Sequence, residues 1–347
     1  MGANGPPDRL LAARVLHEEA AQEGFTRFGV ARAGDAPRFE RFESWVAAGF
    51  HAGMRYLEDT LALRRSPREL LSGARSVVCL AAPHSPEPYV GPDGSRYARY
   101  ARGDDYHGSL RERACRVVER ARARLPGGWA ARVCVDSTPL AERAFAAAAG
   151  LGWIGKNGCL IDPEQGSYLL LAEILTDLDL PPDDPAAEQC GACRRCLDAC
   201  PTGALNAPAV LDAGRCIAYW TIEHSGAVPE AWKHTLGDHV FGCDICQEVC
   251  PWNAPLSARA SLRPAATEAP SRADVLAMGR GAWRRRFGKT AVNRATRRGL
   301  QRNAALSAGS SGDRSCLPAL AAAARVREPG LSDAALWALG MLSRHPL

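Results

Sequence analysis

The chain has 347 residues, of which 46% are hydrophobic and 23% charged, and its formal net charge is +5. This composition indicates an ordinary soluble protein with room for two or three domains that have proper cores. The chain has no apolar run long enough to span a bilayer, and its opening, M-G-A-N-G-P-P-D, has neither an apolar export segment nor a twin arginine. We therefore expect a cytoplasmic protein without membrane contact, and we exclude a disulfide framework.

The N-terminal half alternates helical and strand-like patterns. It begins with a helix from Asp8 to about Gln22, followed by a strand over Phe25–Ala31. Three further runs predict buried strands, at Ser76–Ala82, Ala131–Val135 and Tyr168–Leu175. The fold expected for this half is therefore α/β or α+β.

One long helix is predicted between the strands at Ser76–Ala82 and Ala131–Val135. Two glycines, Gly127 and Gly128, end it. Its apolar residues recur at helical spacing and should face the sheet, at positions Leu110, Ala114, Val117, Ala121 and Leu125.

Asp136, in the segment V-D-S-T-P-L-A-E-R, falls at the end of a predicted strand, which is a common place for a catalytic side chain. An acidic group there could donate a proton to a departing oxygen. The structural alternative is a helix cap, because Asp136 or Ser137 directly precedes a helix expected from Pro139. The segment Tyr100–His107, Y-A-R-G-D-D-Y-H, is also rich in groups able to orient a ligand, with plain loop surface as its alternative.

The glycine-rich segment Gly150–Gly155, G-L-G-W-I-G, matches a dinucleotide-binding fingerprint and, with Lys156, the start of a P-loop. Both motifs require a strand before the glycines and a helix after them. Here a helical A-E-R-A-F-A-A-A-A segment comes first and a β-like run over Cys159–Ile161 follows, while Asn157 replaces the Ser or Thr of a P-loop. We therefore reject a dinucleotide or ATP site, although the loop could still bind another ligand through its N–H groups and Lys156.

Beyond a linker predicted at Pro181–Pro185, the segment Cys190–Pro201 carries the C-x2-C-x2-C-x3-C-P spacing of a [4Fe-4S] ferredoxin. A shortened form follows at Cys243–Pro251, and the isolated Cys216 completes a set of eight. The exchange rule of two-cluster ferredoxins assigns four ligands to each cluster. One set is Cys190, Cys193, Cys196 and Cys250, and the other is Cys200, Cys216, Cys243 and Cys246.

A pair of structural zinc sites is the alternative for these cysteines. Zinc ribbons use separated C-x2-C knuckles, not three cysteines in seven residues followed by Cys-Pro, so we favour the clusters. Five cysteines lie outside the set and receive no role: Cys79, Cys115, Cys134, Cys159 and Cys316.

A basic block runs from Arg284 to Arg302 without an acidic residue. It attracts polyanions through phosphate contacts, with a solvated helix face as the alternative. The tetrapeptide N-A-A-L at Asn303–Leu306 recurs as D-A-A-L at Asp333–Leu336, which suggests two stacked helical repeats. Such helices would suit a platform that holds tRNA by shape and backbone. The candidate tRNA contacts are Arg297, Arg298 and Arg302.

Together, these segments resemble the epoxyqueuosine reductase family over nearly the whole chain. The motifs that carry the resemblance are Tyr100–His107, Val135–Arg143, Gly150–Asn157, the first cysteine run, and F-G-C-D-I-C-Q-E-V-C-P-W-N at Phe241–Asn253. The resemblance implies a cobalamin-dependent enzyme that reduces epoxyqueuosine at the tRNA wobble position to queuosine.

The resemblance also implies an α+β architecture in three parts. These are a nitroreductase-like cobalamin-binding α/β domain at residues 1–180, a ferredoxin-like domain with two [4Fe-4S] clusters at 181–262, and HEAT-like helical tRNA-binding repeats at 271–347. It implies a monomer that receives electrons from an external reductant such as a flavodoxin or ferredoxin. Asp136 takes the proton-donor role, and the residues implied at the corrinoid are Arg102, Tyr106, Ser137, Lys156, Asn157 and Asp244.

Corrinoid proteins that supply a histidine to cobalt often carry D-x-H-x-x-G, but here Asp105 and His107 are followed by Leu110 in place of the glycine. We therefore expect His107 to be a loop histidine and not a cobalt ligand. Two other functions stay open at this point: a corrinoid reductive dehalogenase, which is normally exported, and a ferredoxin-type electron carrier without a substrate. Binding of a corrinoid and of tRNA would discriminate among the three.

Overall fold

A four-stranded sheet forms the centre of the N-terminal half of the computed structural model, which describes residues 7–254 and 268–344. Its strand order is β1-β2-β8-β5, and every neighbouring pair is antiparallel. The predicted strands are confirmed, with ends that differ by no more than about two residues. They are β1 (Arg27–Arg32), β2 (Ser76–Pro83), β5 (Ala131–Cys134) and β8 (Leu169–Thr176).

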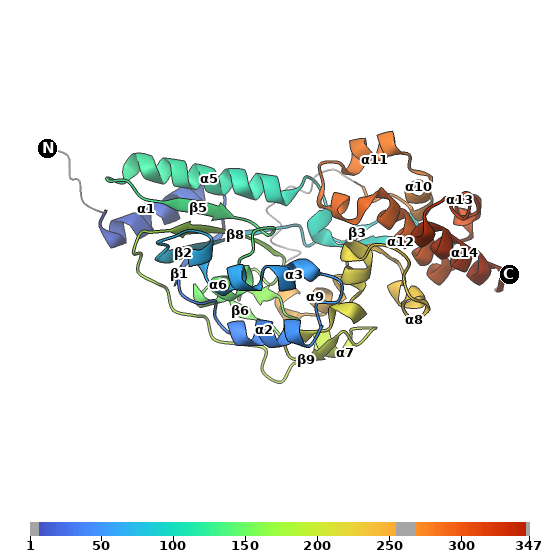
Figure 1. Ribbon diagram of the computed structural model, residues 1–347, viewed down its shortest axis with the longest axis horizontal. Coiled ribbons are helices and arrows are strands. Elements are labelled where there is room, and N and C mark those ends of the chain that lie inside the picture. The colour runs from blue at the N-terminus through green and yellow to red at the C-terminus, as the bar shows by residue number, and fades with distance from the viewer. Residues whose placement is uncertain (1–6, 255–267, 345–347) are drawn as a thin grey trace.

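Helices cover both faces of this sheet (Figure 1). On one face lie α1 (Arg9–Gln22), which Asp8 caps, and α5 (Tyr106–Arg124). The whole predicted apolar stripe of α5 is buried in the core against β2 and β8, so that prediction is confirmed. On the other face, α6 (Glu142–Ala148) packs Phe145 among residues of β2 and β8. Both faces of the sheet are therefore buried, which explains why the sequence of β2 is almost continuously apolar.

The other elements of this half are short. They are α2 (Phe39–Ala47), α3 (Arg55–Asp59), α4 (Leu61–Arg65), β3 (Tyr89–Val90), β4 (Arg96–Tyr97), β6 (Trp153–Ile154) and β7 (Leu160–Ile161), with 3-10 turns at Pro67–Glu69 and Arg99–Ala101. The glycine-rich segment follows α6 and contains β6, and β7 comes after it. The predicted order of helix, glycines and strand is therefore confirmed, and neither the dinucleotide-binding fingerprint nor the P-loop applies.

The cysteine-bearing segment contains only short elements. They are α7 (Arg195–Asp198), β9 (Leu205–Ala207), β10 (Val210–Leu211), α8 (Glu230–Lys233), β11 (His239–Phe241) and α9 (Ile245–Glu248), with a π-helical turn at Tyr219–Glu223 and 3-10 turns at Ala213–Arg215, His234–Leu236 and Pro251–Asn253. Strand β11 pairs in parallel with β4, which pairs with β3. The first and second predicted domains therefore share one small sheet, and the predicted end of the second domain, at residue 262, lies outside the described residues.

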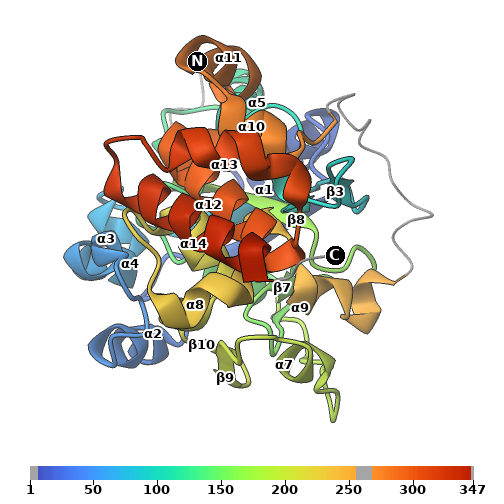
Figure 2. The same ribbon diagram turned by 90° about the vertical axis from the view of Figure 1, so that its right-hand side faces the viewer.

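Helices stack at the C-terminal end of the molecule (Figure 2). They are α10 (Arg272–Ala277), α11 (Arg280–Phe287), α12 (Thr296–Ser311), α13 (Leu317–Ala323) and α14 (Pro329–Arg344), with 3-10 turns at Ala291–Ala295 and Arg314–Cys316. The two similar tetrapeptides lie on α12 and α14, which pack against each other closely enough that Gly309 has no room for a Cβ beside Ala338. Within the two described ranges, no helix combines the length and apolar character needed to cross a bilayer.

Candidate active site at Asp136

Asp136 lies two residues after the end of β5, in the left-handed region of backbone conformation with φ +46°. Its Oδ2 accepts hydrogen bonds from the Tyr106 hydroxyl and, at 2.7 Å, from Nε2 of His107. The helix that follows begins only at Glu142, and its N-cap is Ala141 without a side-chain hydrogen bond. Asp136 is therefore not a helix cap, because the helix expected near Pro139 begins three residues later, at Glu142.

His107 bridges two carboxylates. Its Nδ1 lies 2.5 Å from Oδ1 of Asp105, while its Nε2 binds Asp136. The hydrogen bond to Asp136 and that to Asp105 outweigh burial and raise the pKa of His107 to about 9. Burial alone would raise the pKa of Asp136, but hydrogen bonds from His107 and Tyr106 lower it. At neutral pH His107 is therefore a positively charged imidazolium and Asp136 a carboxylate. Both ring nitrogens of His107 are hydrogen-bonded to carboxylates.

Tyr100 connects this group to the cysteine-bearing segment. Its ring meets that of Tyr106 edge-on at 5.9 Å between centroids and that of Phe241 at 6.1 Å. Burial and then the charges of Asp136 and Asp244 raise the pKa of Tyr100. A line of aromatic rings therefore leads from Asp136 to Phe241, which precedes the first cysteine of the second motif by two residues.

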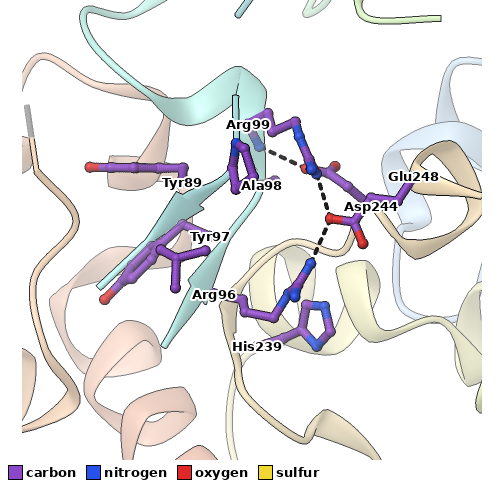
Figure 3. A pocket seen from close by; sticks show the side chains of 10 residues that line it. Tyr89, Arg96, Tyr97, Ala98, Arg99, His239, Asp244 and Glu248 are labelled. Carbon is purple, nitrogen blue, oxygen red and sulfur yellow. Dashed lines mark hydrogen bonds and ion pairs between the residues drawn. The ribbon is translucent and has the colours of Figure 1, made fainter. Parts of the chain in front are cut away.

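Asp244, between two of the predicted cluster ligands, is 8% exposed and bound to Arg99. Its Oδ2 accepts from the backbone N–H of Arg99 at 2.8 Å and lies 3.3 Å from its guanidinium, while Glu248 joins Arg99 to Arg96 (Figure 3). Burial raises the pKa of Asp244 against the effect of Arg99. The cavity beside this network measures about 10 Å³, enough for one water molecule, so it is no substrate pocket.

The first motif and the end of the second lie close together in space. Burial raises the pKa of Cys250, and the nearby thiols of Cys190 and Cys193 raise it further. The pKa of Cys196 is raised by burial and by Cys250 and Cys190. The structure therefore brings together the four thiols predicted to hold one cluster.

The other four thiols form a second neighbourhood. Burial and then Cys216 and Cys200 raise the pKa of Cys243 to about 12. The pKa of Cys246 is raised well above its ordinary value by burial, and Cys159, Cys243 and Cys216 contribute in that order. In the described part of the chain no three metal-binding side chains stand at the spacing of a single ion. A cube of four irons holds its thiolates farther apart than one ion does.

The glycine-rich loop grips both cysteine segments. Lys156 donates from Nζ to the carbonyls of Gly191 and Cys193 at 2.6 and 3.0 Å. Asn157, which is 7% exposed, donates to the carbonyl of Cys246 at 3.5 Å. The side chains predicted at a corrinoid therefore lie against the cluster loops.

Two further side chains predicted at the corrinoid, Ser137 and Arg102, lack strong partners within the described residues. Ser137 is exposed next to Asp136 and makes only a 3.5 Å contact to the carbonyl of Val135. Arg102 lies over the ring of Tyr89 at 5.7 Å, and its buried Nε has no hydrogen-bond partner within the described residues. Both can therefore offer hydrogen bonds to a bound group.

Arg302 cannot contact tRNA, which corrects the prediction made for it. Its side chain is 2% exposed, and it donates to the carbonyls of Trp220, His224 and Gly226 and to Asn303. Periodicity did not reveal this role, because a charged residue on an alanine-rich helix is normally at its surface.

The other two predicted contacts, Arg297 and Arg298, are half-buried and both donate to Oε1 of Gln301. Five other basic residues of the block are exposed: Arg284, Arg285, Arg286, Lys289 and Arg294. The carbonyl of Lys289 accepts from the N–H of Asp105 at 2.8 Å, so the basic segment reaches the Asp136 region.

Sequence reasoning missed two groups beside Asp136. Glu142 accepts the backbone N–H of Asp136, and burial together with the charge of Asp136 raises its pKa to about 7. Arg294 forms a paired contact with Glu223 at 2.7 and 3.1 Å, and its charge helps to lower the pKa of Asp136. Glu142 lies within the same conspicuous motif as Asp136, so its spacing was the available signal, whereas nothing local distinguished Arg294 from its basic neighbours.

Family models match two segments of the chain. Residues 64–137 match "Epoxyqueuosine reductase QueG, DUF1730", and residues 189–253 match a "4Fe-4S double cluster binding domain". A curated epoxyqueuosine reductase of Gloeobacter violaceus is 41% identical over 314 residues, which cover 87% of this chain and 97% of the relative.

Two solved structures are similar over nearly the whole chain. A crystal structure of epoxyqueuosine reductase with an epoxyqueuosine-modified tRNA-Tyr stem loop matches with a TM-score of 0.84 and 30% identity, covering 95% of this chain and 89% of that one. The Bacillus subtilis epoxyqueuosine reductase, captured with its catalytic loop swung out of the active site, matches with a TM-score of 0.83 and 30% identity, covering 95% and 90%.

Proposed function

The chain belongs to the epoxyqueuosine reductase family, and on that premise we propose that it reduces epoxyqueuosine to queuosine at the wobble position of a tRNA anticodon. In the reaction, two electrons and two protons convert the epoxide into a carbon–carbon double bond, and the oxygen leaves as water. The relatives make both alternatives, the reductive dehalogenase and the electron carrier, unnecessary.

The electrons enter through two [4Fe-4S] clusters. We propose Cys190, Cys193, Cys196 and Cys250 as the ligands of one, and Cys200, Cys216, Cys243 and Cys246 as those of the other. The proximity of the thiols within each group supports this division. The proposed donor is a flavodoxin or a ferredoxin, and the protein is proposed to act as a cytoplasmic monomer.

Cobalamin is the cofactor proposed between clusters and substrate. The residues offered to it are Arg102, Tyr106, Ser137, Lys156, Asn157 and Asp244. The unpartnered buried Nε of Arg102 and the exposed hydroxyl of Ser137 fit a ligand rich in amide groups, and the engagement of both nitrogens of His107 fits a cobalt without a protein histidine. Bound and reduced, cobalamin supplies the low-potential electrons that open the epoxide.

Asp136 is proposed to deliver the proton to the departing oxygen. It must first take that proton from His107, which holds it at neutral pH because its pKa is about 9. The hydrogen bond of 2.7 Å between the two side chains provides the transfer path, and Tyr106 fixes the carboxylate from the other side. A positioned acid of this kind contributes roughly two to four powers of ten in rate.

The exposed basic residues of α11 and the turn after it are proposed to hold the tRNA. Arg284, Arg285 and Lys289 are exposed and can meet phosphates, and their segment touches Asp105 beside His107. Arg297 and Arg298 remain candidates at the next turn of the chain. The packing of α12 on α14 supports HEAT-like repeats at 271–347, and the helix-covered sheet supports a nitroreductase-like domain at 1–180 beside the ferredoxin-like 181–262.

The observation that carries the proposal is the placing of Asp136 between a proton-holding histidine and a line of aromatic rings that ends at the second cysteine motif. The test is anaerobic reconstitution, followed by turnover on epoxyqueuosine-containing tRNA with added corrinoid. We expect about eight irons and eight sulfides per chain, and queuosine as the product. Material that holds only zinc, or that binds no corrinoid, would contradict the proposal.

A further inference from the structure

Two carboxyl groups, those of Glu142 and Glu173, lie next to the loop that carries Asp136. The proposed reaction uses neither of them. Glu142 is the first residue of α6. Glu173 lies in β8 at the centre of the sheet, paired with Cys79 on one side and Cys134 on the other. Glu173 is 0% exposed, and neither of its oxygens has a hydrogen-bond partner of normal geometry among the described residues. A carboxyl in the middle of an apolar sheet is costly, so its presence calls for a cause.

Glu142 contacts the backbone of the proposed acid directly. Its Oε1 accepts the N–H of Asp136, whose φ of +46° is a conformation that side chains other than glycine adopt rarely. Strained backbone of this kind persists only where the surroundings hold it. In the described residues, no other hydrogen bond of the Asp136 N–H is found, so the Glu142 carboxyl is the contact that fixes this peptide.

The two carboxyls lie close enough to influence each other's protonation. Burial and then the charge of Glu142 raise the pKa of Glu173 far above its ordinary value, so Glu173 stays neutral. Glu142 faces Asp136 and Tyr106 together with the cations Arg64 and Arg143, and the thiols of Cys79 and Cys134 lie near the pair. Its pKa of about 7 means that it becomes a carboxylate near neutral pH.

We propose that Glu142 is a positioning residue for Asp136: its carboxylate holds the left-handed peptide that aims the Asp136 side chain at the substrate, and the neutral Glu173 behind it completes the support. The inference rests on the proposed role of Asp136 as proton donor. A negative charge on Glu142 has a second effect, because it favours the protonated form of the neighbouring Asp136. The same contact therefore aims the acid and favours transfer of the proton to it from His107.

Two variants of Glu142 separate these effects. Glu142→Gln keeps an oxygen that accepts the N–H but removes the charge, whereas Glu142→Ala removes both. We expect deuterium exchange of the peptide spanning residues 131–141, measured by mass spectrometry on the cluster-loaded protein, to quicken by about 10-fold in Glu142→Ala and by under about threefold in Glu142→Gln. Equal exchange in wild type and Glu142→Ala would overturn the proposal.

Turnover should follow the same order. We expect kcat on epoxyqueuosine-containing tRNA to fall by about 10-fold to 100-fold in Glu142→Ala, with KM for tRNA within about twofold, because misplacement of an acid by an ångström has effects of this size. Glu142→Gln should recover most of that loss below pH 7, where wild-type Glu142 is itself neutral. If both variants lose activity equally at every pH, Glu142 acts by charge alone and the positioning role is refuted.

Glu173→Gln tests the neutral partner, because an amide has the shape of a protonated carboxyl. The wild-type protection of the loop should rise as pH rises through about 7, and we expect Glu173→Gln to keep that profile. A shifted profile would mean that Glu173 is ionised and would overturn its part in the proposal. Asp136→Asn tests the proposed role of Asp136 separately from that of Glu142. If this variant retains turnover, Asp136 is not the proton donor. Deuterium exchange of the loop still tests the contact between Glu142 and the Asp136 N–H.

Discussion

Charged side chains are buried in two regions of this molecule, and the regions differ in how those charges are matched. In the helical region, Arg302 gives its donors to three backbone carbonyls and to Asn303, and Arg272 binds Asp93, Asp238 and the hydroxyl of Ser307. In the Asp136 region, three carboxyls crowd together, one of them without a hydrogen bond of normal geometry and another on strained backbone.

The difference indicates that the buried charges of the helical region stabilise the fold, whereas those of the Asp136 region serve the reaction. A buried guanidinium whose donors are all satisfied fixes one arrangement of the chain and has no capacity left for a ligand. In the Asp136 region, by contrast, the carboxyls and the protonated histidine have pKa values shifted from their ordinary values. Such shifts are typical of sites that move protons. Variants in the first region should therefore change stability, and variants in the second should change the rate.

The largest effect is expected at Asp136. Asp136→Asn keeps the shape but cannot supply the proton, so single-turnover formation of queuosine should slow by roughly two to four powers of ten. Its free energy of unfolding should change little, because the amide oxygen of the asparagine can still accept the hydrogen bonds from Tyr106 and His107. The matched control is Asp184→Asn, at an exposed aspartate of the linker after β8. A slow but otherwise stable variant supports the comparison, and a fully active one would break it.

Arg302→Met should do the opposite. Removing the guanidinium leaves the carbonyls of Trp220, His224 and Gly226 buried without a donor, so we expect the free energy of unfolding to fall by about 3 kcal/mol. Denaturant unfolding measures this, with the half-buried Arg297→Met as the control that should lower it by under about 1 kcal/mol. If folded Arg302→Met instead bound tRNA more weakly at unchanged stability, the structural role would be refuted.

How far the sequence predicts this site depends on whether the contacts are local. The strands, the α5 stripe and the cluster cysteines follow from periodicity and spacing, which act over a few residues. The burial of Arg302 and the position of Glu173 could not be predicted, because each depends on segments distant in sequence, as the hydrogen bond from Arg302 to the carbonyl of Trp220 illustrates. The helix cap that was the alternative at Asp136 does not form for a related reason: His107 and Tyr106, from another helix, donate hydrogen bonds to its carboxylate.

The exposed basic residues in and after α11 extend the same comparison, since Arg284, Arg285 and Lys289 have no acidic partner among the residues that the structure describes. Alanine at Arg284, Arg285 and Lys289 together should weaken tRNA binding, and the slope of log K against log salt should fall by about 0.7 to 0.9 for each phosphate that is no longer neutralised. Filter binding at several salt concentrations measures this. Arg14→Ala, on α1 at the opposite end of the molecule, is the control and should leave the slope unchanged (Figure 1). An unaltered slope in the triple variant would move the tRNA site elsewhere.

The smallest effect is expected at Trp153, whose polar contact with a predicted cluster ligand should shift a reduction potential without being essential for the reaction. Its indole Nε1 lies 3.5 Å from Sγ of Cys190 and its ring packs edge-on against Trp252. A hydrogen bond to a ligand sulfur stabilises the more negative, reduced cluster, so Trp153→Phe should make the potential of one cluster more negative and leave the other unchanged. Potentiometric titration followed by electron paramagnetic resonance resolves the two. Trp129→Phe is the control, because the buried Nε1 of Trp129 has no partner within the described residues and its removal should shift neither potential. Two unshifted clusters in Trp153→Phe would show that this indole serves packing alone.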